Sequence, residues 1–201
     1  MMPLRPMATP AEPAHEEHSE LPLDVARRAQ RCDPKAIADW VRFYERPVHA
    51  LLYRMLAPVG RAHACEDLSQ EVFLRAFKAL PRFDLDGPAR LSTWLLTIAT
   101  RLALNELRRP CAVPRDFDPA SVAAGADRPD TNAERRAIGA AIARALGGLE
   151  PEFRAPFVLR EFHGLEYAEI AEALEIDLGT VRSRLSRARA RLRTALQELK
   201  P

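Results

Sequence analysis

Apolar residues recur every three or four positions through most of this 201-residue chain, and no segment shows the alternation that is typical of a half-buried strand. One long segment breaks the pattern. Residues 110–133 contain four prolines, a glycine and many small or polar residues, a composition that favours a flexible linker. The sequence therefore predicts an all-α fold of two small helical domains, at residues 21–109 and 134–201, joined by that linker.

The N-terminal segment, residues 1–20, has four prolines, and four glutamates against one arginine. It predicts a disordered acidic tail, and it lacks the apolar stretch of a signal peptide. No segment approaches the roughly 18 apolar residues that span a bilayer. The three cysteines are far apart and form no CxxC pair, as is usual in a reducing compartment. We therefore expect a cytoplasmic protein that does not insert into a membrane.

The sequence contains few of the residue patterns that enzymes use. His63 and Cys65 are close together, but no further ligands follow at the spacing of a zinc site. A Gly-rich phosphate loop is absent, and no His or Cys partner accompanies a plausible nucleophile. We therefore expect no metal site, no cofactor and no catalytic activity.

Three helices are predicted in the first domain. The first begins at Asp33, an N-cap residue followed by proline, and is expected to be kinked or split at Pro47. The second covers residues 66–80, and the third runs from Ser92, a good N-cap residue, to Arg109. The core face of the second helix is expected to consist of Leu68, Val72, Phe73, Ala76, Phe77 and Leu80.

Helices are also predicted in the second domain, at residues 151–162, at 167–174, and from an N-cap at Asp177 to Leu199. The connection between the last two is so short that it indicates a helix-turn-helix. The last helix has a narrow apolar stripe, and its segment 179–195 holds six arginines and no acid. Such a helix can lie in the major groove of DNA. The expected DNA contacts are Thr180, Arg182, Ser183, Arg184 and Arg187.

The charges of the second domain are segregated. Residues 150–177 carry eight acids and two arginines, a net charge of −6, directly before the basic last helix. A charge run alone is often only the solvated face of a helical bundle. The segregation favours DNA binding, because only the last helix could then face DNA. The net charge of +2, by itself weak evidence for a nucleic-acid-binding protein, is thus a sum of opposed regions.

The third helix of the first domain carries another candidate nucleic-acid face. Residues 90–109 include four arginines and one acid, and hydroxyl groups share a face with guanidinium groups, which suits a phosphate backbone. The same periodicity places Thr100 on this face. The alternative is a face that only keeps the helix soluble. The candidate contacts are Arg90, Thr93, Thr97, Arg101 and Arg108.

Opposite its core face, the helix at residues 66–80 has a polar row with one leucine in the middle. An exposed leucine among polar residues indicates a docking surface. An ordinary solvated face with one stray leucine is the alternative. The row consists of Asp67, Gln70, Glu71, Leu74 and Lys78.

Four segments resemble parts of bacterial RNA polymerase sigma factors of the extracytoplasmic-function (ECF) type. GLEYAEIA at residues 164–171 and GTVRSRLSRAR at residues 179–189 resemble the domain that binds the −35 promoter element. DLSQEVF at residues 67–73 resembles the segment that docks on the clamp helices of the largest polymerase subunit. LSTWL at residues 91–95 resembles the start of the −10 helix. The resemblance covers nearly all of both predicted domains.

By this resemblance the chain would be a sigma factor. It would bind core RNA polymerase through Asp67, Gln70, Glu71 and Leu74, and it would recognise the −35 element with its last helix. The third helix and the loop before it, residues 83–90, would melt the −10 element, because that loop captures a flipped base in the family. Core polymerase and promoter DNA are thus the expected partners. An anti-sigma factor is a candidate partner, since such proteins are common in the family.

Three residues depart from the family's pattern. Glu175 stands where the family has a turn glycine, which would cost about 1 kcal/mol if that position needs a positive φ. Glu166 replaces a capping Ser or Thr, so the helix that follows is expected to fray at its start. Arg101 replaces an Asn in the −10 helix.

Two other functions are compatible with the sequence. One is a conventional helix-turn-helix regulator, which binds duplex DNA without polymerase. Transcription that depends on core polymerase separates it from a sigma factor. The other is a helical adaptor such as a sigma mimic, in which the basic helix is dispensable. In that case, replacing Arg184 and Arg187 by alanine would leave transcription unchanged.

Overall fold

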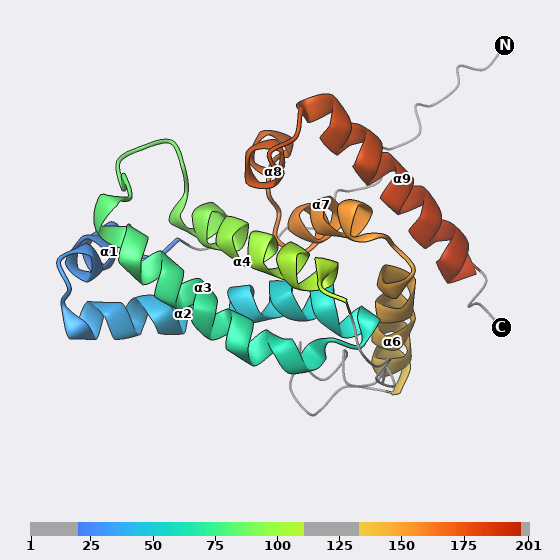
Figure 1. The fold of residues 1–201 in the computed structure, drawn as a ribbon, viewed down its shortest axis with the longest axis horizontal. Helices are drawn as coiled ribbons and strands as arrows, with labels where there is room; N and C mark the ends of the chain where they lie inside the picture. The colour runs from blue at the N-terminus through green and yellow to red at the C-terminus, as the bar shows by residue number, and fades with distance from the viewer. Residues whose placement is uncertain (1–19, 111–132, 198–201) are drawn as a thin grey trace, which may run out of the picture.

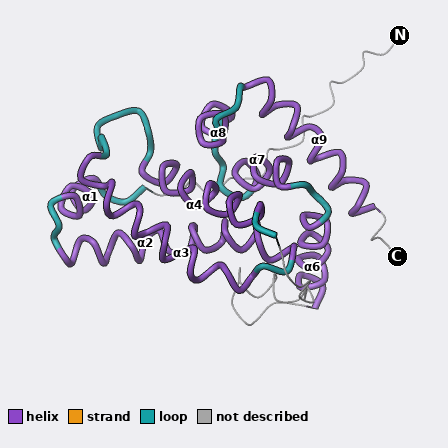
Figure 2. The backbone as a smooth tube through the Cα atoms, in the orientation of Figure 1, coloured by secondary structure: helices purple, strands orange, loops and turns teal. Residues whose placement is uncertain are grey.

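The structure, a computed structural model, describes residues 20–110 and 133–197, and within these ranges the chain is helical and contains no strand. This confirms the predicted all-α fold. Helices α1–α4 form one domain and α6–α9 the other, and α7 and α8 lie against α4 (Figure 1; Figure 2). The predicted tail, except Glu20, and nearly all of the predicted linker lie outside the described residues. The helices are α1 (Leu23–Gln30), α2 (Pro34–Leu56), α3 (Cys65–Ala79), α4 (Leu91–Arg108), α6 (Ala133–Gly147), α7 (Pro151–Glu161), α8 (Tyr167–Leu174) and α9 (Leu178–Gln197).

The first domain is built around α2. This helix packs against α1, α3 and α4, and its side chains Trp40 and Leu51 have no exposed surface. Asp33 caps it as predicted. One carboxylate oxygen of Asp33 accepts hydrogen bonds from the backbone nitrogens of Lys35 and Ala36, at 2.9 and 3.3 Å. The pair Asp33-Pro34 alone was therefore sufficient to predict where this helix begins.

The split expected as one outcome at Pro47 is not found, because α2 is continuous from Pro34 to Leu56. Proline removes one hydrogen bond of the helix. However, Tyr44 and Val48, on either side of Pro47, are both buried in the same core. Their burial holds the helix together across the proline.

Helix α4 begins at Leu91 and does not use the predicted cap. No side chain caps its first turn, and Ser92 lies inside the helix. Ser92 is buried, and its hydroxyl donates to the carboxylate of Glu20, which also accepts a hydrogen bond of 2.8 Å from the Tyr44 hydroxyl. A contact with a distant residue has therefore replaced the local cap.

Two helices have no counterpart in the prediction. Helix α1 is only eight residues long and buries Ala26 and Ala29. It packs against α2. Helix α6 packs against α9 and against the short turn Ala57–Val59, which follows α2 in the first domain. Both helices are held by packing against other elements rather than by strong local signals.

Candidate polymerase and nucleic-acid interfaces

The polar row predicted on α3 lies on the surface. Asp67 and Gln70 are exposed, and Leu74 leaves 56% of its surface exposed. Glu71 is half-buried and pairs with Arg75 of the same helix, with 2.6 Å between nitrogen and oxygen. The structure thus brings all four candidate residues together on one open helix face.

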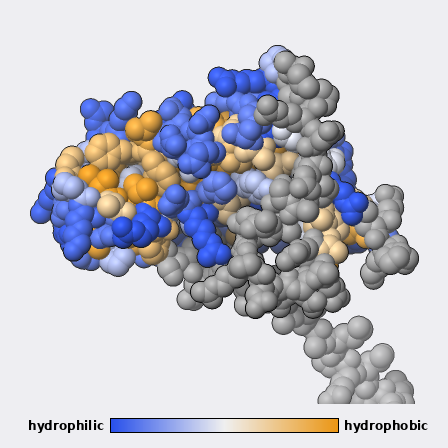
Figure 3. All heavy atoms as spheres, turned by 90° about the horizontal axis from the view of Figure 1, so that it is seen from below, coloured by the Kyte–Doolittle hydropathy of each residue, from blue (hydrophilic) through white to orange (hydrophobic). Residues whose placement is uncertain are grey.

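An apolar hollow of about 660 Å³ borders this row, between α2 and α3. Trp40, Phe73, Leu74 and Phe77 are among the residues that line it. Figure 3 shows apolar atoms gathered within a polar rim on the first domain. Phe77 was predicted to be in the core and is 41% exposed, because it lies at the edge of the α3 face that α2 and α4 cover. The open apolar surface is therefore larger than the sequence indicated.

The candidate face of α4 is only partly open. Arg90 and Arg108 are exposed, whereas Thr97 is half-buried and its hydroxyl donates to the main-chain oxygen of Thr93 at 2.8 Å. Thr100 does not belong to this face. It is fully buried, and its hydroxyl donates to a main-chain oxygen of its own helix at 2.7 Å.

The other two candidates on α4 contact the second domain. The hydroxyl of Thr93 donates to the carboxylate of Glu169 at 2.9 Å. The guanidinium of Arg101 forms an ion pair of 2.9 Å with Glu175 and donates to the main-chain oxygen of Ala173 at 3.4 Å. The acidic helix α8 and the turn after it thus cover part of the basic face of α4.

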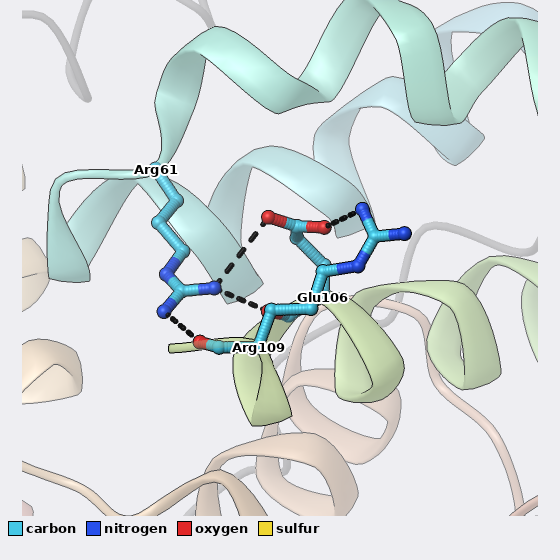
Figure 4. A network of polar contacts seen from close by, with 3 residues as sticks. All are labelled: Arg61, Glu106 and Arg109. Atoms are coloured by element: carbon cyan, nitrogen blue, oxygen red, sulfur yellow. Dashed lines mark hydrogen bonds and ion pairs between the residues drawn. The ribbon is translucent and has the colours of Figure 1, made fainter. Parts of the chain in front are cut away.

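The C-terminal end of α4 is held by Arg61, a residue that the sequence did not single out (Figure 4). Its side chain is 11% exposed. Its guanidinium donates to the main-chain oxygens of Glu106 and Arg109, the latter at 2.6 Å, and lies 3.5 Å from the Glu106 carboxylate. Carbonyl groups at a helix C-terminus lack partners within the helix and attract cations. Arg61 therefore fixes the turn that carries Arg108.

The loop between α3 and α4 borders an open surface hollow of about 370 Å³. The rings of Phe83 and Trp94 line it, with their centroids 4.8 Å apart, and Arg82 stands beside them. An ion pair of 2.7 Å between Arg27 and Asp86 ties this loop to α1. Aromatic faces next to an arginine suit the stacking of an unpaired base.

The turn after α8 has the backbone conformation that the sequence left conditional, and the start of α8 corrects a prediction. Glu175 has φ 55° and ψ 46°, so the position does adopt the positive φ that its alignment with a turn glycine suggested. The start of α8 was expected to fray, but Glu166 and Glu169 form a capping box, in which the Glu169 carboxylate accepts a hydrogen bond of 2.7 Å from the Glu166 nitrogen. A glutamate can serve as cap because its carboxylate reaches the backbone N–H three residues on.

Asp177 caps α9 as predicted. Its carboxylate accepts hydrogen bonds from the hydroxyl and the backbone nitrogen of Thr180, at 2.5 and 2.7 Å. These hydrogen bonds hold the pKa of Asp177 below its ordinary value. Thr180, a candidate DNA contact, is thus engaged in the cap.

Most of the remaining candidate side chains on α9 are exposed and form no ion pair, whereas one is half-buried and lies near an acid. Arg182, Ser183 and Arg187 are exposed, and neither of these arginines forms an ion pair within the described part of the chain. Arg184 is half-buried and lies 3.8 Å from Glu152. The apolar stripe of the helix is buried as predicted and consists of Val181, Leu185, Ala188 and Leu192.

Further along α9, two arginines are paired with acids of the same domain. Arg189 pairs with Glu161 at 2.7 Å, and Arg191 pairs with Glu150. Both carboxylates belong to the acidic segment before the helix-turn-helix. The sequence does not distinguish the arginines of this helix. In the fold, Arg184, Arg189 and Arg191 pair with acids, whereas the exposed side chains of Arg182, Arg187 and Arg193 form no ion pair within the described residues.

Among residues 20–110 and 133–197, no cluster of three His, Cys, Asp or Glu side chains is placed to bind a metal ion. No described helix has the length and apolar character needed to cross a membrane. His63 is exposed, whereas Cys65 is buried, and burial raises the pKa of its thiol to about 12.

Comparison with known proteins assigns both domains to families. Residues 40–110 match the family described as Sigma-70 region 2, and residues 139–192 match Sigma-70, region 4. The ECF RNA polymerase sigma factor SigE of Mycolicibacterium smegmatis is 37% identical over 90% of this chain and 70% of its own length. The ECF RNA polymerase sigma factor SigW of Bacillus subtilis is 31% identical over 86% of this chain and 95% of its own.

Two solved structures have a similar fold. CnrH, in complex with the cytosolic domain of CnrY, has a TM-score of 0.62 and 24% identity, and the match covers 89% of this chain and 98% of CnrH. The sigma factor RpoE of Bartonella quintana, in complex with the anti-sigma factor NepR, has a TM-score of 0.63 and 20% identity. That match covers 81% of this chain and 98% of RpoE.

Proposed function

Because this chain belongs to the ECF family of RNA polymerase sigma factors, we propose that different helices bind the polymerase and the two promoter elements. The chain directs core RNA polymerase to promoters, and it is an initiation factor and not an enzyme. In our proposal α9 recognises the −35 element, α4 and the loop before it open the −10 element, and α3 binds core polymerase. A role in transcription also supports a cytoplasmic location.

The −35 assignment depends on one observation. Arg182 and Arg187 are exposed and unpaired within the described chain, whereas Arg189 and Arg191, further along the same helix, are paired with acids. An unpaired guanidinium in the first turns of a recognition helix can donate two hydrogen bonds to a guanine edge or bind a phosphate. Ser183 lies between them on the exposed surface and adds a hydroxyl.

The −10 assignment is supported by α4 and its preceding loop. Arg90 and Arg108 are exposed at the two ends of α4 and suit the phosphates of a melted strand. The rings of Phe83 and Trp94 supply a surface on which an extruded base can stack. Thr93, Thr97 and Arg101 complete the proposed face.

The polymerase assignment is supported by the open face of α3. Asp67, Gln70 and Glu71 supply polar groups around Leu74. The apolar hollow beside this row continues the surface to Phe77. A central apolar anchor with a polar rim is the usual anatomy of a protein interface. We also propose an anti-sigma partner for this chain, because the solved structure of RpoE contains the anti-sigma factor NepR.

The experiment that tests this function is run-off transcription with purified core polymerase over a library of random promoters. We expect enrichment of two separated sequence elements. A double variant, Arg182→Ala with Arg187→Ala, should lose the upstream element and keep the downstream one. The exposed Arg193, nearer the end of the helix, provides the matched control Arg193→Ala. Selection of one duplex site by the chain alone, without transcription, would instead identify a conventional helix-turn-helix regulator.

A further inference from the structure

Helix α1, which the sequence did not predict, lies at the end of the first domain that carries the loop between α3 and α4 (Figure 1). It is outside residues 40–110, the part of the chain that matches Sigma-70 region 2. Two buried alanines pack it against α2. Two polar side chains, Arg27 and Gln30, reach from α1 to the loop. These two side chains tie α1 to the segment that carries the Phe83 ring.

Gln30 bonds to the backbone at both ends of the short turn Leu80–Arg82, which follows α3. Its side-chain nitrogen donates to the main-chain oxygens of Leu80 and Phe83, at 2.9 and 2.6 Å. A primary amide nitrogen carries two hydrogens, so it can make both bonds at once. The Leu80 oxygen also accepts a hydrogen bond of 3.0 Å from the Phe83 nitrogen, which closes the turn. Gln30 therefore fixes the turn from which the Phe83 ring projects.

The backbone position of Phe83 decides where its ring points. Phe83 has extended backbone angles, φ −72° and ψ 129°, directly after the helical turn. The chain therefore changes direction at this residue, and the direction of its Cβ atom depends on how the turn is held. The ring lines the surface hollow together with Trp94. Through the Phe83 carbonyl, Gln30 thus acts on the wall on which an extruded base would stack.

Arg27 holds the same loop three residues beyond Phe83. Its guanidinium pairs with Asp86 at 2.7 Å, and it lies three positions before Gln30, on the same side of α1. Both partners of this pair are exposed, at 49% and 69%. Exposed pairs contribute little to the stability of a fold. The pair is therefore better suited to restraining the loop than to holding the domain together.

The residue at the start of this segment, Glu20, contacts the helix that supplies the other wall of the hollow. Its carboxylate accepts hydrogen bonds from Ser92, in the first turn of α4, and from Tyr44 of α2. Trp94 follows Ser92 by two residues. Residues 20–30 thus contact both segments that supply an aromatic ring to the hollow.

We propose that α1 is a positioning element for the opening of the −10 element, and that Gln30 acts through the Phe83 ring. The inference rests on the proposed function, because it takes the loop before α4 as the part that receives the extruded base. A loop that is ordered only when the base arrives would use part of the binding free energy for that ordering. Gln30 and Arg27 hold the loop in place beforehand. More of the stacking free energy then remains for keeping the base out of the duplex.

The test is a double-mutant cycle on transcription from a duplex promoter, with purified core polymerase and a promoter selected from the random library. Gln30→Met removes both hydrogen bonds at similar side-chain length and helix propensity. We expect it to lower transcription about fivefold, a part of the stacking contribution that Phe83→Ala removes in full. A template melted in advance around the −10 element should restore its activity.

The double variant distinguishes positioning of the ring from general support of the fold. Gln30→Met combined with Phe83→Ala should match Phe83→Ala alone within about twofold, because no ring is left to position. Losses that multiply to about fiftyfold would overturn the inference, since they would show that Gln30 acts independently of the ring.

Arg27→Met tests the second contact without disturbing a buried group, and Arg28→Met is its matched control. Arg28 is the next residue on α1 and is similarly exposed, but its 2.9 Å ion pair is with Asp33, the cap of α2. We expect about a threefold loss of transcription for Arg27→Met and none for Arg28→Met. If circular dichroism shows that Gln30→Met has lost helicity, this pair decides, and equal transcription by the two variants overturns the inference.

Phe83→Ala separates this inference from the proposed function. Undiminished transcription in Phe83→Ala would contradict the proposed role of the loop itself. A loss in Phe83→Ala, with undiminished transcription in both Gln30→Met and Arg27→Met, would leave that role intact and overturn the positioning by α1.

Discussion

The guanidinium of Arg61 lies 2.6 Å from the main-chain oxygen of Arg109, which is 48 residues further along the chain. Replacing Arg61 by methionine would leave the last carbonyl groups of α4 without partners. We expect the free energy of unfolding to fall by about 2 kcal/mol, as for other buried hydrogen bonds to a charged group. Urea denaturation measures this loss. Arg42→Met is the control, because the pair of Arg42 with Asp39 is exposed and should contribute less than about 0.5 kcal/mol.

The cap of α9 should respond to acid. The folded pKa of Asp177 is lowered by the hydrogen bonds from Thr180, so its charged form stabilises the fold. That stabilisation is complete above the unfolded pKa, about 3.9, and is lost as the pH falls through the folded pKa. We therefore expect the difference in Tm between wild type and Asp177→Asn to be constant near neutral pH and to shrink below about pH 4. A difference that stays constant into the acid range would show that the carboxylate charge is not what stabilises the cap.

The α3 surface leads to a prediction about polymerase binding. Leu74→Arg places a charge at the centre of an apolar contact and should weaken the affinity for core polymerase by about thirtyfold, or 2 kcal/mol. Surface plasmon resonance with immobilised core polymerase measures it. The control is Leu23→Arg on α1, where a leucine of similar exposure lies outside the proposed surface. Equal loss in both variants would mean that the α3 face has no special role.

We expect the Phe83 ring to contribute to the opening of promoter DNA and not to the binding of core polymerase. Phe83→Ala removes one wall of the hollow in the loop before α4. Stacking on an aromatic side chain contributes about 1–3 kcal/mol per base, so we expect transcription from a duplex promoter to fall about tenfold or more. A template melted in advance around the −10 element should restore most of the activity. A defect that persists on the melted template would place the effect elsewhere.

Glu175 combines a strained backbone with an ion pair, and two variants separate the effects. Glu175→Gln keeps the positive φ and removes the pair with Arg101, which should cost up to about 0.5 kcal/mol because the pair is exposed. Glu175→Gly also relieves the backbone strain. We expect the glycine variant to be more stable than the glutamine variant by about 1 kcal/mol in thermal denaturation. Equal stability would mean that Glu175 adopts this conformation without strain.

Much of the local structure could be predicted from the sequence, because its signals involve neighbouring residues. Asp33 and Asp177 are caps that bond to backbone groups two or three positions away. The buried stripe of α9 follows from helical periodicity. The positive φ of Glu175 is suggested only by the turn glycine that the family has at that position.

The predictions that failed concern residues whose partners are distant. Ser92 bonds to Glu20 rather than capping its own helix, and Pro47 is tolerated because the residues around it are buried. The contacts of Thr93 and Arg101 with Glu169 and Glu175 depend on how two domains meet, and no spacing within one helix encodes them. The same holds for Arg61, whose partners follow it by 45 and 48 residues.

The ion pairs of Arg189 and Arg191 affect how the protein searches a chromosome. A fully exposed arginine helix would displace many condensed cations from any DNA it met, and that release drives binding without regard to sequence. In this fold, Glu161 and Glu150 already serve as counterions to two of the arginines. Fewer cations are released at random sites, so the chain spends less time trapped on them. Residence on DNA then depends more strongly on the bases themselves.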